Sequence, residues 1–270
     1  MTHHQYSSRS NKASNNLAGT IPSEIRALTT LSFFDIFDNN VGGTIPASIS
    51  ELPQLVLFDV EDNNLIGQAF VDVSGLSSLI SYRVSFNALT GTIPIETISP
   101  NLIELWVAGN QITGVLPPAI GSLTNLGKCL WNFYAVETTP SRFCLTSAYS
   151  LPCADFLYIY NNLLTGTLPS ELGTLGLQRF QAQNNDFTGT IPENLYFNAD
   201  LFELRLDGNN LGGTISGRVG DLQGMLDLRL DNNELSGTIP ATLSRLSVLR
   251  KLNSRGFVSL QNIRIPFPID

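Results

Sequence analysis

A short recurring phrase constrains this chain more than any other feature. The phrase reads NELSGTIPATL from Asn233, and close copies begin at Asn15, Asn39, Asn87, Asn110, Asn162 and Asn185. With the weaker copies at Asn63 and Asn209 included, successive asparagines are 24, 24, 24, 23, 52, 23, 24 and 24 residues apart. A fixed period of roughly 20–50 residues is typical of a solenoid, in which each repeat buries its apolar face against its neighbours.

Apolar residues also recur upstream of each asparagine, at positions −11, −8, −5 and −3. For Asn39 these residues are Leu28, Leu31, Phe34 and Ile36. The last two are separated by one residue, so both point to the same side of an extended chain, and the residues between them point outward. The pattern therefore predicts one short strand per repeat, with all strands parallel and joined in a continuous sheet.

The complete pattern, LxxLxxLxLxxNxLxGxIPxxL, closely resembles the plant-type leucine-rich repeat, and the resemblance extends from about Asn15 to Ser254. It implies an α/β-type repeat solenoid shaped as a horseshoe or arc. One parallel β-sheet lies on the concave face, and short second strands and 3-10 or irregular turns lie on the flank and convex side. The known proteins it resembles are the ectodomains of receptor-like kinases and receptor-like proteins, and polygalacturonase-inhibiting proteins.

The repeated asparagines are expected to have a structural role. A side-chain amide at the end of each strand can bond backbone groups of adjacent turns that are buried and would otherwise remain unpaired. The predicted asparagine ladder consists of Asn39, Asn63, Asn87, Asn110, Asn162, Asn185, Asn209 and Asn233.

The 52-residue spacing is interpreted as two repeats of about 24 and 28 residues, the first of them atypical and spanning 123–150. Its beginning fits the apolar pattern at Leu123, Leu126, Cys129 and Trp131, but it lacks the GxIP phrase. The chain then divides into an irregular N-terminus without a proper cap (1–14), a solenoid of about ten repeats (15–257) and a C-terminal tail that is a possible improvised cap (258–270).

Three cysteines lie in or beside the atypical repeat. Cys129 occupies an apolar core position, which leaves Cys144 and Cys153 as a candidate disulfide. The alternative is that all three are reduced, since an odd number leaves at least one thiol free.

Composition and motifs give no indication of catalysis. The formal net charge is −8, with 15 basic and 23 acidic residues, which is unfavourable for binding nucleic acid or an anionic membrane. The only histidines, His3 and His4, lie in the irregular N-terminus, so no Ser–His or Cys–His pair is expected on the solenoid. We therefore predict no enzymatic activity, no cofactor and no metal. The chain as given carries no signal peptide or membrane-spanning stretch.

Function is sought in the outward residues of the strands, which form three zones. Asp35, Asp38, Asp59, Glu61 and Asp62 form an acidic zone, for which a basic partner, a Ca²⁺ site and a solvated surface are the alternatives. Aromatic residues form a second zone, and exposed apolar patches of this kind mark interaction sites. Arginines flanked by carboxylates form a third. The predicted ligand-binding residues are Trp106, Phe133, Phe156, Tyr158, Tyr160, Arg179, Arg205 and Arg229.

These observations favour a non-enzymatic recognition module that binds a protein, peptide or glycan on the concave face. The resemblance implies a receptor-like protein in signalling or defence, extracellular or attached to the plasma membrane. Two alternatives remain: a secreted inhibitor of cell-wall-degrading enzymes, and a structural or adhesive scaffold. The sequence does not name the ligand.

Overall fold

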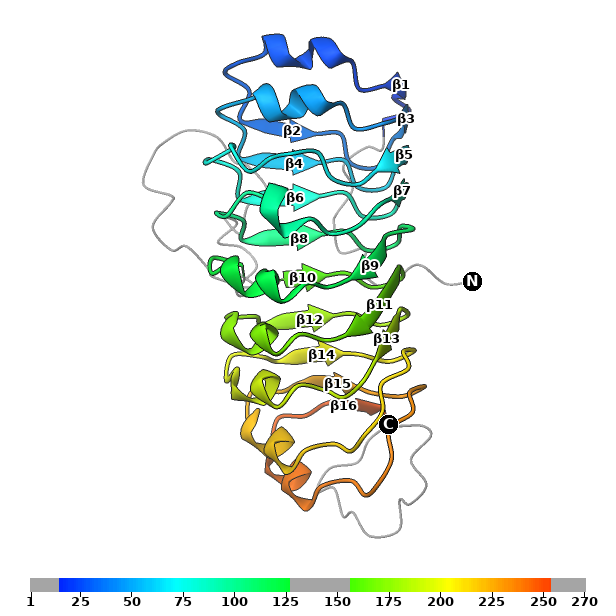
Figure 1. The fold of residues 1–270 in the computed structure, drawn as a ribbon, viewed down its shortest axis with the longest axis vertical. Coiled ribbons are helices and arrows are strands. Elements are labelled where there is room, and N and C mark those ends of the chain that lie inside the picture. Colours follow the sequence, from blue (N-terminus) through cyan, green and yellow to red (C-terminus); the bar gives the residue numbers. More distant parts are fainter. Residues whose placement is uncertain (1–14, 127–155, 254–270) are drawn as a thin grey trace.

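The described part of the chain is a stack of similar coils. The computed structural model describes residues 15–126 and 156–253, which run in order from one end of the stack to the other (Figure 1). A regular coil contains a three-residue strand, a second short strand on the flank and a short 3-10 helix. The predicted leucine-rich repeat solenoid with a parallel sheet is therefore confirmed.

The first strands of the coils form one nine-stranded parallel sheet in the order β16-β15-β14-β12-β10-β8-β6-β4-β2. The middle residue of each strand faces the core, as Phe58, Leu105 and Leu204 illustrate with no exposed surface. We call the opposite side of this sheet the strand face. The strands are β2 (Phe33–Asp35), β4 (Leu57–Asp59), β6 (Ser81–Arg83), β8 (Glu104–Trp106), β10 (Phe156–Tyr158), β12 (Arg179–Gln181), β14 (Glu203–Arg205), β15 (Asp227–Arg229) and β16 (Lys251–Asn253).

The second strands pair along the flank in two parallel sheets, β1-β3-β5-β7 and β13-β11-β9. These second strands all run in the same direction, because the segment after the asparagine passes the same edge of the stack in every coil (Figure 1). The strands are β1 (Ala18–Thr20), β3 (Asn40–Gly43), β5 (Asn64–Gln68), β7 (Ala88–Thr90), β9 (Thr113–Val115), β11 (Leu163–Thr167) and β13 (Asp186–Thr188).

The GxIP proline sets the start of the following 3-10 helix. Proline precedes seven of the described 3-10 helices, and Pro46 is extended, with φ −73° and ψ 140°. Ser216 replaces it before η7, keeps the same conformation and accepts a hydrogen bond from Arg218 N. The helices are η1 (Ser23–Ala27), η2 (Ala47–Glu51), η3 (Ile95–Thr97), η4 (Pro118–Ser122), η5 (Ser170–Thr174), η6 (Glu193–Phe197), η7 (Gly217–Asp221) and η8 (Ala241–Arg245).

The repeated asparagine joins each coil to the one before it. Asn63 Nδ2 lies 2.9 Å from Ile36 O of the preceding coil and 3.2 Å from Val60 O of its own. Its Oδ1 accepts from Val41 N at 3.0 Å. One side chain thus pairs backbone groups of two coils at once. The same bonds recur at Asn87, Asn110, Asn162, Asn185, Asn209 and Asn233.

Aromatic rings replace leucine in the core near the N-terminal end. Phe34 stacks on Phe58 at 5.5 Å between ring centroids, and Phe58 stacks on Tyr82 at 5.2 Å. Phe70 covers Tyr82 from the flank at 5.6 Å, and the buried Tyr82 hydroxyl donates to Ala69 O at 2.7 Å. The phrase Gln68-Ala69-Phe70, which stands where Thr-Ile-Pro is expected, therefore accommodates the larger core residue.

The 52-residue spacing corresponds to a single step of the sheet, which corrects the expected strand order. β8 pairs directly with β10, with Trp106 opposite Tyr158. Asn162 bonds Val107 O and Ile112 N, as any asparagine bonds the coil before it. No strand therefore lies between β8 and β10, where the strand of the atypical repeat was predicted, and residues 128–133 are outside the described part of the chain.

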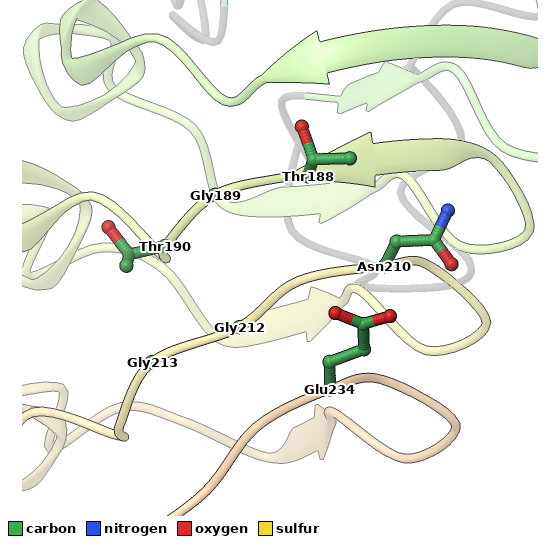
Figure 2. A pocket seen from close by; sticks show the side chains of 7 residues that line it. All are labelled: Thr188, Gly189, Thr190, Asn210, Gly212, Gly213 and Glu234. Atoms are coloured by element: carbon green, nitrogen blue, oxygen red, sulfur yellow. The ribbon is translucent and has the colours of Figure 1, made fainter.

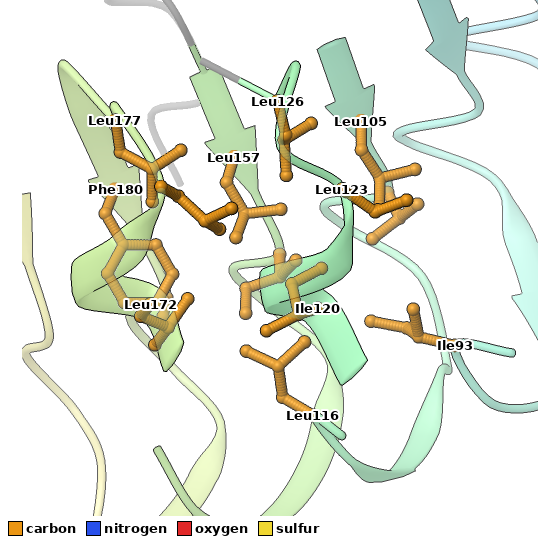
Figure 3. Packing of buried hydrophobic residues seen from close by; sticks show 14 of the residues in the cluster. Ile93, Leu105, Leu116, Ile120, Leu123, Leu126, Leu157, Leu172, Leu177 and Phe180 are labelled. Carbon is orange, nitrogen blue, oxygen red and sulfur yellow. The ribbon is translucent and has the colours of Figure 1, made fainter. Parts of the chain in front are cut away.

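Leu123 and Leu126 explain the correction. They complete the coil of β10, packing near Leu105 and Leu157 with at most 1% of their surface exposed (Figure 3). Their apolar pattern continues into Leu157, which belongs to the same core. The 52-residue spacing between Asn110 and Asn162 is therefore one regular spacing of 24 residues plus 28 additional residues.

Candidate binding site

Parallel register brings four of the eight predicted binding residues into one row on the strand face. Trp106 lies opposite Tyr158, Tyr158 opposite Gln181, Gln181 opposite Arg205, and Arg205 opposite Arg229. Adjacent strands are about 4.8 Å apart, so neighbours in this row are in side-chain contact range. The aromatic and arginine zones are thus continuous.

The structure brings three of the predicted aromatic residues together. The ring centroids of Trp106 and Tyr158 are 5.2 Å apart, and those of Tyr158 and Tyr160 are 6.0 Å apart in an edge-on arrangement. All three side chains are half-buried, so part of each remains exposed. Such pairs combine a large apolar surface with polar tips, which suits an interface. We call Trp106, Tyr158 and Tyr160 the aromatic cluster.

Phe86 extends the aromatic cluster and was not among the predicted site residues. Its ring centroid is 6.2 Å from that of Tyr160, although a whole coil lies between them. The intervening coil has Gly109, and a Cβ there would lie 2.6 Å from the Phe86 ring. Phe86 itself has φ 55°, which is strained for a bulky residue. The sequence signal for this contact was the pair of small residues, Ala108 and Gly109, at outward positions of the intervening coil.

Arg83 borders the aromatic cluster on the N-terminal side. Its guanidinium carbon lies 4.2 Å from the centre of the Trp106 ring. The same guanidinium bonds Glu104 at 3.0 Å and Asp59 at 3.3 Å. Burial alone would lower the pKa of Arg83, but Glu104 and Asp59 outweigh it, and the pKa lies above its ordinary value. Arg83 is therefore a fixed positive charge that holds the Trp106 ring from one side.

The acidic zone is built into this network. Asp59 and Glu61 are 3% and 6% exposed, and Asp59 also accepts a hydrogen bond from Glu61 N. Asp38 and Asp62 have positive φ and form the turn after the strand. Within residues 15–126 and 156–253, no three acidic, histidine or cysteine side chains gather as a metal site would require.

The predicted arginines are engaged with carboxylates. Arg205 lies 2.6 Å from Glu203 and 2.9 Å from Asp227, so it bridges two strands. Arg229 approaches the same Asp227 at 3.1 Å. Arg179 lies 3.3 Å from Glu203 and covers the Phe202 ring at 4.9 Å. These pairs neutralise the charges at the beginning of the strands.

Carboxylates at the ends of the same strands are arranged differently. Asp207 follows β14 and Asp231 follows β15, and neither makes an ion pair in the part of the chain that the structure describes. Burial raises the pKa of Asp207 above its ordinary value, and the neighbouring Asp231 raises it further. Arg205 and Arg229 partly offset this effect.

Some predicted residues lie outside what the structure describes. These are Phe133, Cys144, Cys153 and the ranges 1–14, 127–155 and 254–270, which contain most of the atypical repeat, the candidate disulfide and the tail. Phe156 is described only as part of the backbone of β10. No helix in the described ranges is long and apolar enough to cross a membrane.

A shallow depression of about 570 Å³ lies on the flank, away from the strand face (Figure 2). Gly212 and Gly213 form its floor, and Thr188, Asn210 and Glu234 extend around it (Figure 2). It marks the point where the flank sheet ends at β13 and only isolated bridges continue. None of the predicted binding residues lines it.

Comparison with known proteins places the chain in a family. The model of the family described as Leucine Rich Repeat matches residues 101–123, 155–175 and 226–246. The chain is a leucine-rich repeat protein. Its repeats are of the plant type, and its fold resembles the extracellular domains of plant receptor kinases. No curated protein sequence matches, and no enzymatic family is indicated.

Solved structures support the same assignment. The Arabidopsis receptor kinase HAESA, in complex with the peptide hormone IDA and the co-receptor SERK1, shares 30% identity at a TM-score of 0.75, over 90% of this chain and 36% of that one. The plant peptide hormone receptor RGFR1, in complex with RGF2, shares 27% identity at 0.68, over 87% and 37%. A leucine-rich repeat protein of Leptospira interrogans shares 25% at 0.65, over 88% and 52%. The chain thus spans little more than a third of the two plant receptors.

Proposed function

We propose that this chain is a non-enzymatic recognition module that binds a peptide or protein ligand on the strand face, as part of an extracellular receptor-like protein. The aromatic cluster carries this proposal. Two similar plant structures are described as complexes with peptide hormones, which supports a ligand of the same kind. In this proposal the strand face is taken to be the concave face expected of the family.

The aromatic cluster has the properties of an interface anchor. Trp106 is held on one side by Arg83 at 4.2 Å and on the other by Tyr158 at 5.2 Å. A fixed, half-buried ring loses little conformational freedom on binding, so most of its contact energy remains available for the ligand. Tryptophan and tyrosine are also the residues most often found to dominate binding energy.

The arginine zone would contribute charge to the same surface. Arg179 and Arg205 lie one and two strands beyond Tyr158. Their carboxylate partners hold them in place, so we expect them to position a polar part of the ligand more than to supply net charge. In this proposal, the aromatic cluster provides most of the binding affinity, and the arginine zone determines where along the strand face the ligand binds.

The experiment starts from a peptide-display library selected on the full chain, and it measures the affinity of the selected peptides by calorimetry. The Trp106→Ala, Tyr158→Ala, Tyr160→Ala triple variant is expected to bind at least about 100-fold more weakly, because two or more interface anchors are lost. Phe197→Ala is the matched control, since this exposed aromatic residue (58%) lies in η6 and not in the sheet that forms the strand face. Equal binding by the triple variant and the control would refute the site.

A further inference from the structure

Gln183, Asp207 and Asp231 occupy the same outward position in three successive coils. Asn184 N donates to Asp207 O at 2.9 Å, and Gly208 N donates to Asp231 O at 3.0 Å. These bonds stack the three residues in one row, with a spacing of about 4.8 Å between coils. Tyr160 stands at the head of the row, because Asn161 N donates to Gln183 O at 2.9 Å.

Each of these three side chains has a buried acceptor atom without a donor. The atoms are Asp207 Oδ1, Asp231 Oδ1 and Gln183 Oε1, and they have no hydrogen bond among the described residues. Asp231 is only 7% exposed, and its other oxygen accepts from Asn232 Nδ2 at 3.1 Å. Buried acceptors without partners are rare in folded proteins and need a specific explanation.

The nearby cations do not supply the missing donors. Arg205 is bonded to Glu203 and Asp227, and Arg229 is bonded to Asp227. Both carboxylates are the first residues of their strands. The neighbouring Asp231 disfavours the charge on Asp207, and burial of Asp207 adds to the cost of that charge. Asp207 keeps part of its surface exposed whereas Asp231 is buried, so an external group would approach the pair from Asp207.

Resting on the proposed function, we infer that the peptide ligand places a cationic side chain, a guanidinium or an ammonium, over Asp207 and Asp231. A guanidinium is the better fit, because its several N–H groups can bond two carboxylates and an amide oxygen together. The amide oxygen is that of Gln183, which lies in the same row.

The row also predicts the spacing within the ligand. The midpoint of Asp207 and Asp231 is two and a half coils from Tyr160, or about 12 Å. An extended peptide advances about 3.3 Å per residue and places alternate side chains on one side. The cation is therefore expected four positions from an aromatic residue that contacts the aromatic cluster.

The test uses synthetic peptides in which tyrosine and arginine are separated by three alanines, in both orders. Matched peptides carry citrulline, which keeps the shape of arginine but not its charge. Calorimetry is expected to give about 10- to 100-fold tighter binding for one arginine peptide than for its citrulline form, as for a lost charged hydrogen bond. Asp207→Asn with Asp231→Asn should abolish that difference.

Two controls keep the outcomes separate. Asp186→Asn with Asp200→Asn changes the net charge equally on other surfaces and should leave the preference for arginine intact. Equal binding of arginine and citrulline peptides in both orders, including no binding, overturns the cation site and favours a proton shared between the carboxylates. The contribution of the aromatic cluster is measured separately, as the loss of affinity for the citrulline peptides in the Tyr158→Ala, Tyr160→Ala variant. If that affinity does not change, the result counts against the proposed function only.

Discussion

At the scale of single residues, the asparagine amide determines whether neighbouring coils remain joined. The side-chain amide of Asn63 is buried and bonds Ile36 O, Val60 O and Val41 N. The next residue, Asn64, is also an asparagine, but it is exposed. The two positions therefore form a natural comparison.

We predict that Asn63→Ala lowers the free energy of unfolding by about 3 kcal/mol, because it leaves buried backbone groups unpaired. Asn64→Ala should change it by less than about 0.5 kcal/mol, as is usual at exposed positions. Urea unfolding followed by circular dichroism measures both values. Similar losses for the two variants would mean that the amide bonds are not what joins the coils.

Asp207 gives a prediction about pH. Its pKa is raised in the folded state, so the folded chain binds more protons than the unfolded chain, and this residue reduces stability as pH rises through its folded pKa. Asp207→Asn should therefore raise the melting temperature at pH 7. The gain should shrink as pH falls toward about 3.9, the ordinary value for aspartate.

Asp227→Asn is the control for this pH series, because Asp227 is bonded by Arg205 and Arg229. Its substitution should lower stability at pH 7 by about 1.5–3 kcal/mol. A destabilised Asp207→Asn protein at pH 7 would contradict the interpretation of Asp207 as an incompletely compensated charge.

At the scale of elements, the connection between Leu126 and β10 follows the same rule as the regular coils. In those coils one residue separates the last buried leucine from the strand, as Val56 separates Leu55 from Leu57. The chain from Leu126 to Phe156 makes the same step with many more residues. The strand pairing does not depend on the length of that connection.

Removal of residues 128–155 should therefore preserve the solenoid, since it leaves one residue between Leu126 and Phe156. Removal of 127–155 leaves none and should cost several kcal/mol, because the strand can no longer keep its register with Leu157 inward. Circular dichroism and urea unfolding of the two deletion variants provide the comparison. If both variants unfold alike, the single-step geometry at this position is wrong.

At the scale of the whole molecule, coils contact mainly their neighbours in the stack, with the Phe86–Tyr160 ring contact as an exception, so stability is close to a sum of local terms. The period of the asparagines and the leucine pattern were sufficient to predict this architecture, because every coil repeats the same bonds. The strand-face positions of Trp106, Tyr158 and Arg205 also followed from alternation along the strands.

The sequence alone did not predict which side chains from different coils contact one another. Cys129 and Trp131 imitate the apolar pattern, so the direct neighbourhood of Trp106 and Tyr158 was missed. Phe86 reaches Tyr160 only because Gly109 leaves room, which depends on side chains from three coils. Arg205 pairs with Glu203 of its own strand, but it also bonds Asp227 on the next strand.

The single step between Asn110 and Asn162 has a mechanical meaning. Pulled at its two ends, such a stack behaves as a chain of links in series, each of which would release about 24 residues, or about 80 Å of extended chain, as it opens. The link that joins β8 to β10 contains 52 residues, or about 180 Å. Under load, one opening event in the middle of the molecule would therefore lengthen it more than twice as much as any regular link.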